Sequence, residues 1–289
     1  MTSGASARRY VENYLTAQDG LRLYYRDYGD AVSPRLPVLC LSGVTRNSRD
    51  FEPFASRIAG ERRVLSPDYR GRGLSAYDPE WRNYQGLVYV NDALHLLAAT
   101  GTERCVVVGT SLGGILAMGL CALRPSVVAG LVLNDIGPNV GETGLARITD
   151  WISEDKPQPD WATAEGFVRK ALAHLPIKDD VTWRNLTHGT FRKGADGLLH
   201  FDYDTALVKG MLQDRASVPD LWPFFRATRA VPTLLLRGEA SDVLTEEGLA
   251  AMVAVRPDLL HVTVPNAGHV PSLDEPESRQ ALDDFLARF

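Results

Sequence analysis

The sequence predicts an α/β protein: a mostly parallel, doubly wound sheet with an inserted helical cap. Short apolar segments rich in β-branched residues alternate with helical segments near both ends of the 289-residue chain. Residues 138–223 break that alternation, because they are rich in Trp and Pro and contain no strong buried strand. We therefore expect a core of residues 1–137 and 224–289 and a helical cap of residues 138–223.

The first block supplies most of the sheet. Its predicted strands are residues 21–28, 36–41, 63–66, 105–108 and 131–134, and its predicted helices are residues 84–99 and 115–123. Gly101 closes the first of these helices and Pro125 stops the second. The second block repeats the pattern, with strands at 231–236 and 261–264 and helices at 245–254 and 277–289.

Composition narrows the class of partner. The net charge is −5 and no basic run is present, so nucleic acid is not an expected partner. No apolar stretch reaches the length of a membrane span and the N-terminus lacks the apolar core of a signal peptide. The three cysteines, Cys40, Cys105 and Cys121, each lie in apolar surroundings, which is typical of buried thiols in a reducing compartment. We expect a soluble cytoplasmic protein that binds a small-molecule substrate.

Residues 109–113, with the sequence GTSLG, stand where a predicted strand meets a predicted helix. A Gly-x-Ser-x-Gly at such a junction is the signature of a nucleophile elbow, a tight turn that needs small flanking residues and exposes the serine. Ser111 is therefore the candidate nucleophile. A serine hydroxyl needs a base within hydrogen-bond reach and a third group to orient that base. Of the six histidines, only His269 follows the last strand in a glycine-containing loop, so it is the candidate base.

These motifs make the chain resemble the α/β-hydrolases over residues 21–289. Besides the elbow, the resemblance rests on residues 41–43 (LSG), residues 68–75 (DYRGRGLS) and the Gly268-His269 pair. Members of that family carry their triad in the chain order nucleophile, acid, histidine. The segment 138–223 matches the position of the family's helical cap.

The resemblance leaves two candidates for the acid. Many family members place it after the strand that ends near Gly238, with the spacing Gly-x-x-Asp, but here Ser241 stands at that place and Asp242 follows one residue late. Some small esterases and amidohydrolases of the family instead carry the acid one strand earlier, where Asp135 stands, and pair it with a serine at the later site. That arrangement favours Asp135, with Asp242 as the alternative.

The resemblance also implies an oxyanion hole of two backbone N–H groups. Leu112 follows the nucleophile at a helix N-terminus, where the dipole favours negative charge. Val44, in the loop after residues 36–41, is the expected second donor. The family usually has His-Gly in that loop, whereas this chain has Ser42-Gly43, so the hydrogen bonds that support the loop are expected to differ.

Arg46 follows the same loop and could bind a substrate carboxylate, although a solvated arginine or one that braces the loop is the favoured interpretation. Residues 68–73 contain two Gly and two Arg but lack the phosphate-loop pattern, so we interpret them as a structural turn. No cluster has the spacing of metal ligands and no cofactor motif is present, so we expect neither a metal nor a cofactor.

The sequence thus predicts a serine hydrolase that cleaves a carboxylic ester or lactone through an acyl-enzyme on Ser111. The same triad could hydrolyse an amide or a carbon–carbon bond of a ring-cleavage product, because fold does not fix function. A slow-turnover ligand receptor and an acyltransferase are the alternatives from other classes. Dehalogenase and epoxide hydrolase activities are disfavoured, because those relatives use Asp where this chain has Ser111.

Overall fold

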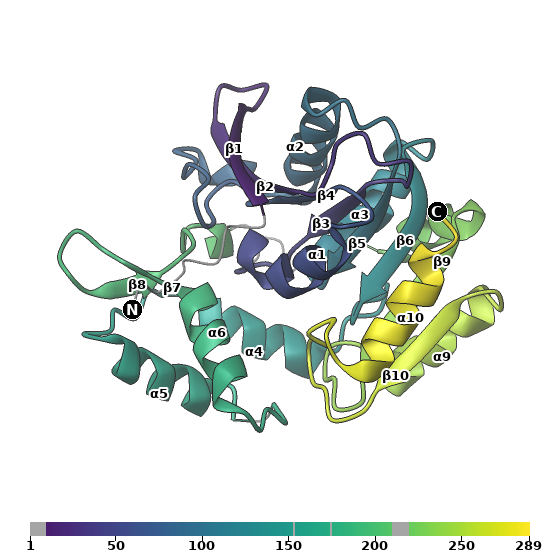
Figure 1. Cartoon of the computed structure of the whole chain (residues 1–289). Helices are drawn as coiled ribbons and strands as arrows, with labels where there is room; N and C mark the ends of the chain where they lie inside the picture. The colour runs from purple at the N-terminus through teal and green to yellow at the C-terminus, as the bar shows by residue number, and fades with distance from the viewer. Residues whose placement is uncertain (1–9, 153, 174, 210–219) are drawn as a thin grey trace, which may run out of the picture.

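An eight-stranded sheet forms the centre of the protein (Figure 1). The computed structural model describes residues 10–152, 154–173, 175–209 and 220–289. The strands of this sheet are β1 (Tyr10–Thr16), β2 (Arg22–Tyr28), β3 (Val38–Leu41), β4 (Val64–Pro67), β5 (Cys105–Thr110), β6 (Val128–Asn134), β9 (Thr233–Gly238) and β10 (Leu260–Val264). Their order is β1-β2-β4-β3-β5-β6-β9-β10. The pairs β1–β2 and β2–β4 are antiparallel and the other neighbours are parallel, which confirms the predicted fold class.

Helices cover both faces of the sheet. They are α1 (Glu52–Ile58), α2 (Gly86–Ala99), α3 (Leu112–Leu123), α8 (Trp222–Ala227), α9 (Glu246–Val255) and α10 (Pro276–Leu286). The predicted strands and helices of both blocks overlap these elements. Strand β1 was not predicted, because its side chains are mostly exposed or half-buried and it lacks an apolar run.

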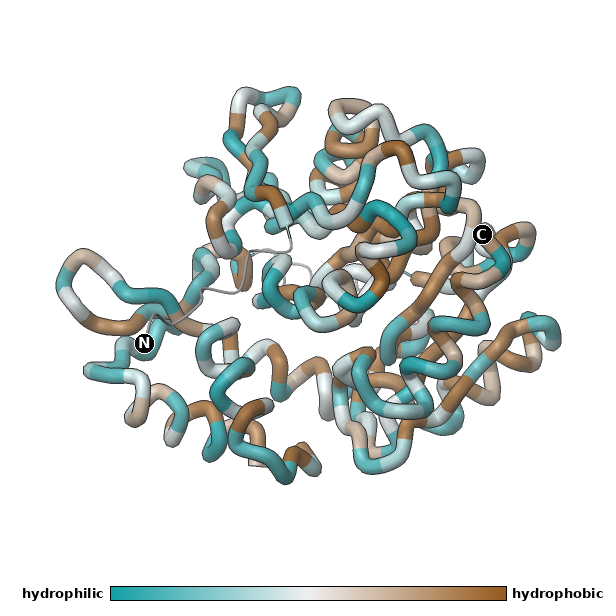
Figure 2. The backbone as a smooth tube through the Cα atoms, in the orientation of Figure 1, coloured by the Kyte–Doolittle hydropathy of each residue, from teal (hydrophilic) through white to brown (hydrophobic). Residues whose placement is uncertain are grey.

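Strand β5 shows how the period-two pattern divides the core. Val106 and Val108 pack in the layer that includes residues of α1 and α10, whereas Val107 packs in the layer with residues of α2 and α3. Every residue of β5 is buried, as expected for a central parallel strand covered on both faces. Figure 2 shows hydrophobic residues along the central strands and hydrophilic ones at the turn between β1 and β2.

The segment between β6 and α8 forms the cap. It contains α4 (Glu142–Ile152), α5 (Trp161–Ala171), α6 (Asp180–Thr190) and an antiparallel hairpin of β7 (Phe191–Lys193) and β8 (Leu199–Phe201). Helices α5 and α6 and the hairpin gather on one side of the core, away from α10 (Figure 1). The sequence predicted helices here but not the hairpin, whose strands are three residues each.

Aromatic side chains give the cap a small core of its own. The rings of Trp151 and Phe167 lie 5.4 Å apart, and those of Phe191 and Phe201 lie 5.1 Å apart. Such pairs add about 0.5–1.5 kcal/mol beyond the apolar area that they bury. The cap is therefore held together by contacts from α4, α5 and the hairpin.

The structure also bears on the cysteines and on the search for a membrane-spanning helix. Cys40, Cys105 and Cys121 are buried and form no disulfide, as predicted for thiols that pack as small hydrophobic side chains. Within the described part of the chain, no helix is both long and apolar enough to cross a membrane.

Candidate active site

Ser111 occupies a strained turn between β5 and α3. Its φ of 51° lies in the left-handed region that most residues avoid. A Cβ at Gly109 would overlap the carbonyl oxygen of Gly113, and a Cβ at Gly113 would overlap the carbonyl oxygen of Leu41. Both glycines are therefore required for the helix to start so close to β3 and β5, and the turn leaves Ser111 half-exposed at the carboxyl ends of the strands.

His269 connects Ser111 to a carboxylate. Its Nε2 lies 3.0 Å from Ser111 Oγ, and its Nδ1 lies 2.7 Å from Asp135 Oδ2. An ionised carboxylate can only accept, so the Nδ1–H donates to Asp135 and the neutral ring accepts the Ser111 hydroxyl at Nε2. The structure thus brings together three residues from the loops after β5, β6 and β10.

Asp135 is fully buried and accepts hydrogen bonds on both carboxylate oxygens. The Gly238 N–H donates to Oδ1 at 2.9 Å, and the Ser241 hydroxyl donates to Oδ2 at 2.6 Å. Ser241 Oγ also accepts from the backbone N–H groups of Val243 and Leu244 at 3.2 and 3.1 Å. Those two donors fix the orientation of the hydroxyl, so its proton is directed at Asp135.

The alternative acid, Asp242, is placed elsewhere. Its carboxylate accepts from Arg147 Nε at 3.0 Å and Arg147 Nη2 at 2.8 Å, on helix α4 of the cap. Ser241 takes the place next to Asp135, and Asp242, one residue later, is directed toward the cap. The structure therefore does not support Asp242 as the partner of His269, which hydrogen-bonds Asp135 instead.

The two expected oxyanion donors flank the serine. Leu112 is the first residue of α3, so its N–H has no partner four residues earlier in the helix. On the other side, a Cβ built on Gly43 would lie 3.8 Å from the Ser111 Cβ, which places the loop of Val44 beside the nucleophile. A carbonyl oxygen bound at Ser111 would thus lie between the β3 loop and the start of α3.

The β3 loop has its own hydrogen-bond support in place of the usual histidine. Ser42 Oγ donates to the Arg46 carbonyl at 3.2 Å, and the Arg46 N–H donates to the Gly43 carbonyl at 3.1 Å. The Tyr69 hydroxyl donates to the Ser42 carbonyl at 3.2 Å, and Arg72 Nε donates to the Val44 carbonyl at 2.9 Å. These bonds fix the backbone of the loop on both sides of Val44.

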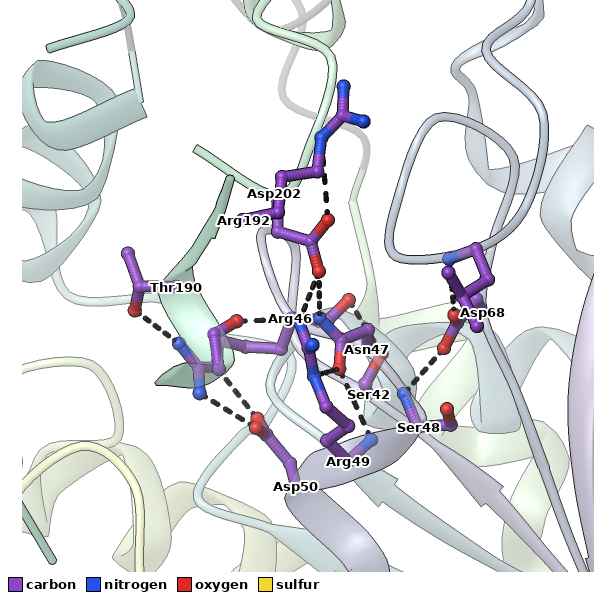
Figure 3. Close-up of polar contacts among 12 residues, drawn as sticks. Ser42, Arg46, Asn47, Ser48, Arg49, Asp50, Asp68, Thr190, Arg192 and Asp202 are labelled. Atoms are coloured by element: carbon purple, nitrogen blue, oxygen red, sulfur yellow. Dashed lines mark hydrogen bonds and ion pairs between the residues drawn. The ribbon is translucent and has the colours of Figure 1, made fainter. Parts of the chain in front are cut away.

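Arg46 is already engaged in protein contacts. Its Nε and Nη2 donate to the two carboxylate oxygens of Asp50, both at 2.7 Å, and its Nη1 donates to Thr190 Oγ1 at 2.8 Å (Figure 3). A guanidinium held by a bidentate carboxylate is a poor receptor for a second carboxylate. The suggestion that Arg46 binds substrate is therefore not supported, and the arginine braces the β3 loop against the cap.

Arg46 belongs to a larger cluster that we call the clasp: Arg46, Asn47, Arg49, Thr190 and Asp202 (Figure 3). Asn47 Nδ2 donates to Asp202 at 3.2 Å, and Arg49 also pairs with Asp202. Burial raises the pKa of Asp202 to about 6, although arginines lie beside it. The clasp joins the end of the β3 loop to the cap, and no local sequence pattern indicates it because its two halves are far apart in the chain.

The motif at residues 68–73 is structural, in agreement with its interpretation as a turn. The Asp68 carboxylate accepts from the backbone N–H groups of Ser48 at 2.7 Å and Leu74 at 2.8 Å. Gly73 has a positive φ of 55°, and a Cβ there would overlap that carboxylate. The motif therefore shapes the loops after β3 and β4.

Comparisons with known proteins agree with this architecture. The model of the alpha/beta hydrolase family matches residues 38–280. An alpha/beta hydrolase from Novosphingobium aromaticivorans has a crystal structure that superposes with a TM-score of 0.91 at 42% identity. That match covers 97% of this chain and 99% of the other chain.

Two curated relatives are similar over most of their length. A 3-hydroxybutyrate-oligomer hydrolase from Cupriavidus necator is 33% identical over 278 residues, 92% of each chain. A 2-(acetamidomethylene)succinate hydrolase from Mesorhizobium japonicum is 26% identical over 251 residues, which cover 86% of this chain and 87% of the relative. Both names describe hydrolases.

Proposed function

Because this chain belongs to the alpha/beta hydrolase family, we propose that it is a serine hydrolase that cleaves a carboxylic ester through an acyl-enzyme on Ser111. The observation that supports this most strongly is the pair of hydrogen bonds that connects Ser111 to His269 and His269 to Asp135. It supplies a nucleophile, a base and an orienting acid in one geometry.

In the acylation step, Ser111 Oγ attacks the ester carbonyl carbon and His269 Nε2 takes the hydroxyl proton. Asp135 keeps the imidazole in the correct tautomer and stabilises the imidazolium without itself taking the proton. The carbonyl oxygen becomes an oxyanion that the N–H groups of Val44 and Leu112 stabilise. Each such donor contributes about 2.7–4 kcal/mol to the transition state.

The tetrahedral intermediate then collapses. The bond between the carbonyl carbon and the alcohol oxygen breaks, and His269 gives its proton to the leaving alcohol. In deacylation, His269 takes a proton from water, whose oxygen attacks the acyl carbon. The carbon–Oγ bond breaks, the proton returns to Ser111 and the carboxylic acid leaves.

For the substrate class, we propose short linear esters of hydroxy acids, and 3-hydroxybutyrate oligomers as the first to be tested. The support is the 33% identity to the 3-hydroxybutyrate-oligomer hydrolase over 92% of both chains. Lactones remain within the same chemistry, because the triad attacks the same carbonyl group. A second candidate is amide hydrolysis, since the chain is also 26% identical to the 2-(acetamidomethylene)succinate hydrolase.

The test measures hydrolysis of 3-hydroxybutyrate dimer and trimer and of p-nitrophenyl butyrate by wild type and Ser111→Ala. We expect release of monomer by the wild type and a loss of at least about 10³-fold in kcat for the variant, as for other serine triads. Full turnover by Ser111→Ala would refute the mechanism. Turnover of p-nitrophenyl butyrate without the oligomers would refute only the substrate class.

If the wild type hydrolyses neither kind of ester, the ester proposal fails. The next substrate to assay is then 2-(acetamidomethylene)succinate, with the same Ser111→Ala control. Adding methanol to the ester assay separates a hydrolase from an acyltransferase, because a transferase would form the methyl ester in preference to the free acid.

A further inference from the structure

The side chain of Asn134 lies beneath the site and contacts parts of it that come from different loops. It is buried at the end of β6, immediately before Asp135. Its Nδ2 donates to the Pro271 carbonyl at 2.9 Å and to Thr110 Oγ1 at 3.1 Å. Separately, the backbone carbonyl of Asn134 accepts the N–H of Ser111 at 3.1 Å.

These contacts join the three loops of the proposed triad. Thr110 precedes Ser111, Pro271 follows His269 by two residues, and Asn134 itself precedes Asp135. The Asn134 side chain thus bridges the Thr110 hydroxyl and the Pro271 carbonyl, while its backbone pairs with Ser111 and leads into Asp135. Asn134 Nδ2 contacts the loop after β10 by its hydrogen bond to the Pro271 carbonyl.

The energetics of Asn134 argue against a purely stabilising role. Its Oδ1 is buried and has no hydrogen-bond partner among the described residues. A buried polar atom left unpaired destabilises a fold by about 1–3 kcal/mol. Stability alone therefore does not account for an amide at this position, whereas the need for a donor toward the loop of His269 does.

We propose that Asn134 is a positioning residue, which holds the loop of His269 at bonding distance from both Ser111 and Asp135. This inference rests on the proposed serine-hydrolase function. The His269 ring must satisfy a 3.0 Å contact and a 2.7 Å contact simultaneously, so a small shift of its loop breaks one of them. A misplacement of about 1 Å can lower a rate about a hundredfold.

The experiment uses Asn134→Leu, which keeps a similar shape and removes the donor. We expect kcat on p-nitrophenyl butyrate to fall by about tenfold or more with little change in KM, because the bound ester does not contact the amide. The second-order rate of Ser111 phosphonylation by a fluorophosphonate should fall in parallel, since it needs the same activated serine.

Thr228→Val is the matched control. Thr228 is buried in the core, where its hydroxyl donates to the Phe225 carbonyl at 2.7 Å and accepts from Arg256 at 2.9 Å. The variant loses a buried polar group remote from the three loops, so its Tm should fall while its kcat per labelled site stays at the wild-type value. If Asn134→Leu does not fold, Asn134→Ser replaces it, because the shorter side chain cannot reach Pro271.

A lowered Tm with kcat and phosphonylation rate both within about twofold of wild type would overturn the proposal. A crystal structure of the variant tests the geometry independently of any substrate. We expect the His269 Nε2 to Ser111 Oγ distance to exceed the hydrogen-bonding limit of about 3.5 Å. If the loop of His269 does not move in the variant, the inference about Asn134 is overturned. If the loop moves but the wild type hydrolyses no ester, the proposed function alone is overturned.

Discussion

The loops after β6 and β9 follow neighbouring parallel strands, and each carries an aspartate that could serve the same histidine. In the loop after β6, Asp135 is fully buried and hydrogen-bonds to His269. In the loop after β9, Asp242 is partly exposed and pairs with Arg147 of the cap. The two side chains differ in their surroundings far more than in their positions along the sheet.

The difference shows that a carboxylate gains its role from the donors around it. The end of β9 and the loop after it supply two hydrogen bonds to the Asp135 carboxylate, from the Gly238 N–H and the Ser241 hydroxyl. One strand end therefore provides the carboxylate and the next provides its support. Four predictions test these separate roles of the two strand ends, and a fifth tests a buried carboxylate in the cap.

Asp135→Asn should have the largest effect. An amide cannot accept bonds from His269, Ser241 and Gly238 as the carboxylate does, so the imidazole takes the wrong tautomer. We expect kcat on p-nitrophenyl butyrate to fall by about 10⁴-fold, as in serine proteases with the same change. An unchanged Tm would show that the fold survives, and phosphonylation of Ser111 should slow together with kcat. A loss of less than tenfold would contradict the role of Asp135.

The double variant Asp135→Asn/Ser241→Asp tests whether the acid can move to the neighbouring loop. Ser241 Oγ lies 2.6 Å from Asp135 Oδ2, so a carboxylate at position 241 would point toward His269 Nδ1. We expect kcat to recover about tenfold or more over Asp135→Asn alone, because a carboxylate again orients the imidazole. No recovery in a folded double variant would mean that the backbone of the β9 loop excludes the acid.

Ser241→Ala should have an intermediate effect. It removes one donor from Asp135 and leaves the N–H groups of Val243 and Leu244 without their acceptor. We expect kcat to fall about tenfold and the free energy of unfolding to fall by about 1–3 kcal/mol. Ser241→Thr keeps the hydroxyl and should restore most of the activity. Equal activity losses in the Ala and Thr variants would show that packing, and not the hydroxyl, matters.

Asp242→Asn should change activity little, with kcat within about twofold of wild type. The variant loses a partly exposed ion pair with Arg147. Such pairs contribute about 0.2–1 kcal/mol, so chemical denaturation should show a small loss that disappears at high salt. A large loss of kcat with normal stability would instead show that Asp242 contributes to the reaction.

Asp202 contrasts with both loops, because it is a buried carboxylate in the cap whose pKa is raised by burial to about 6. Arg46, Arg49, Arg192 and Asp68 are charged groups that act on it. At a pH between the ordinary pKa of 3.8 and about 6, the Asp202 carboxyl keeps its proton in the folded protein and loses it in the unfolded chain. The stability that this group contributes is therefore lost as the pH rises through that window. Thermal unfolding from low to neutral pH should show this decline in wild type and not in Asp202→Asn; parallel curves would contradict it.

Local patterns were enough to predict the strands of the sheet other than β1 and to single out Ser111 and His269. The elbow is a contiguous strand, turn and helix, so its pattern is visible in the sequence; contacts within the turn require Gly109, and strand β3 requires Gly113. The structure places these two side chains 3.0 Å apart. The sequence did not decide the acid of the triad, because the spacing of residues after the strands allowed both Asp135 and Asp242. Only the path of the chain after β9 decides which of them faces the histidine.

Contacts between distant segments could not be read from the sequence. Arg46 and Thr190 are separated by 144 positions, so no local pattern indicates that they meet. Asn134 gave no signal either, because an Asn at a strand end usually reads as part of a turn. The β7–β8 hairpin was missed because each of its strands is three residues long.

The clasp has a consequence for how this protein can be recombined. Arg46 and Asn47 come from the core, whereas Thr190 and Asp202 come from the cap. The cap is therefore not an exchangeable module, even though it is inserted at a single place in the chain. A chimera that receives a relative's cap must also receive the matching residues 46–50. That exchange also changes the hydrogen bonds between Arg46 and the β3 loop of the proposed oxyanion hole.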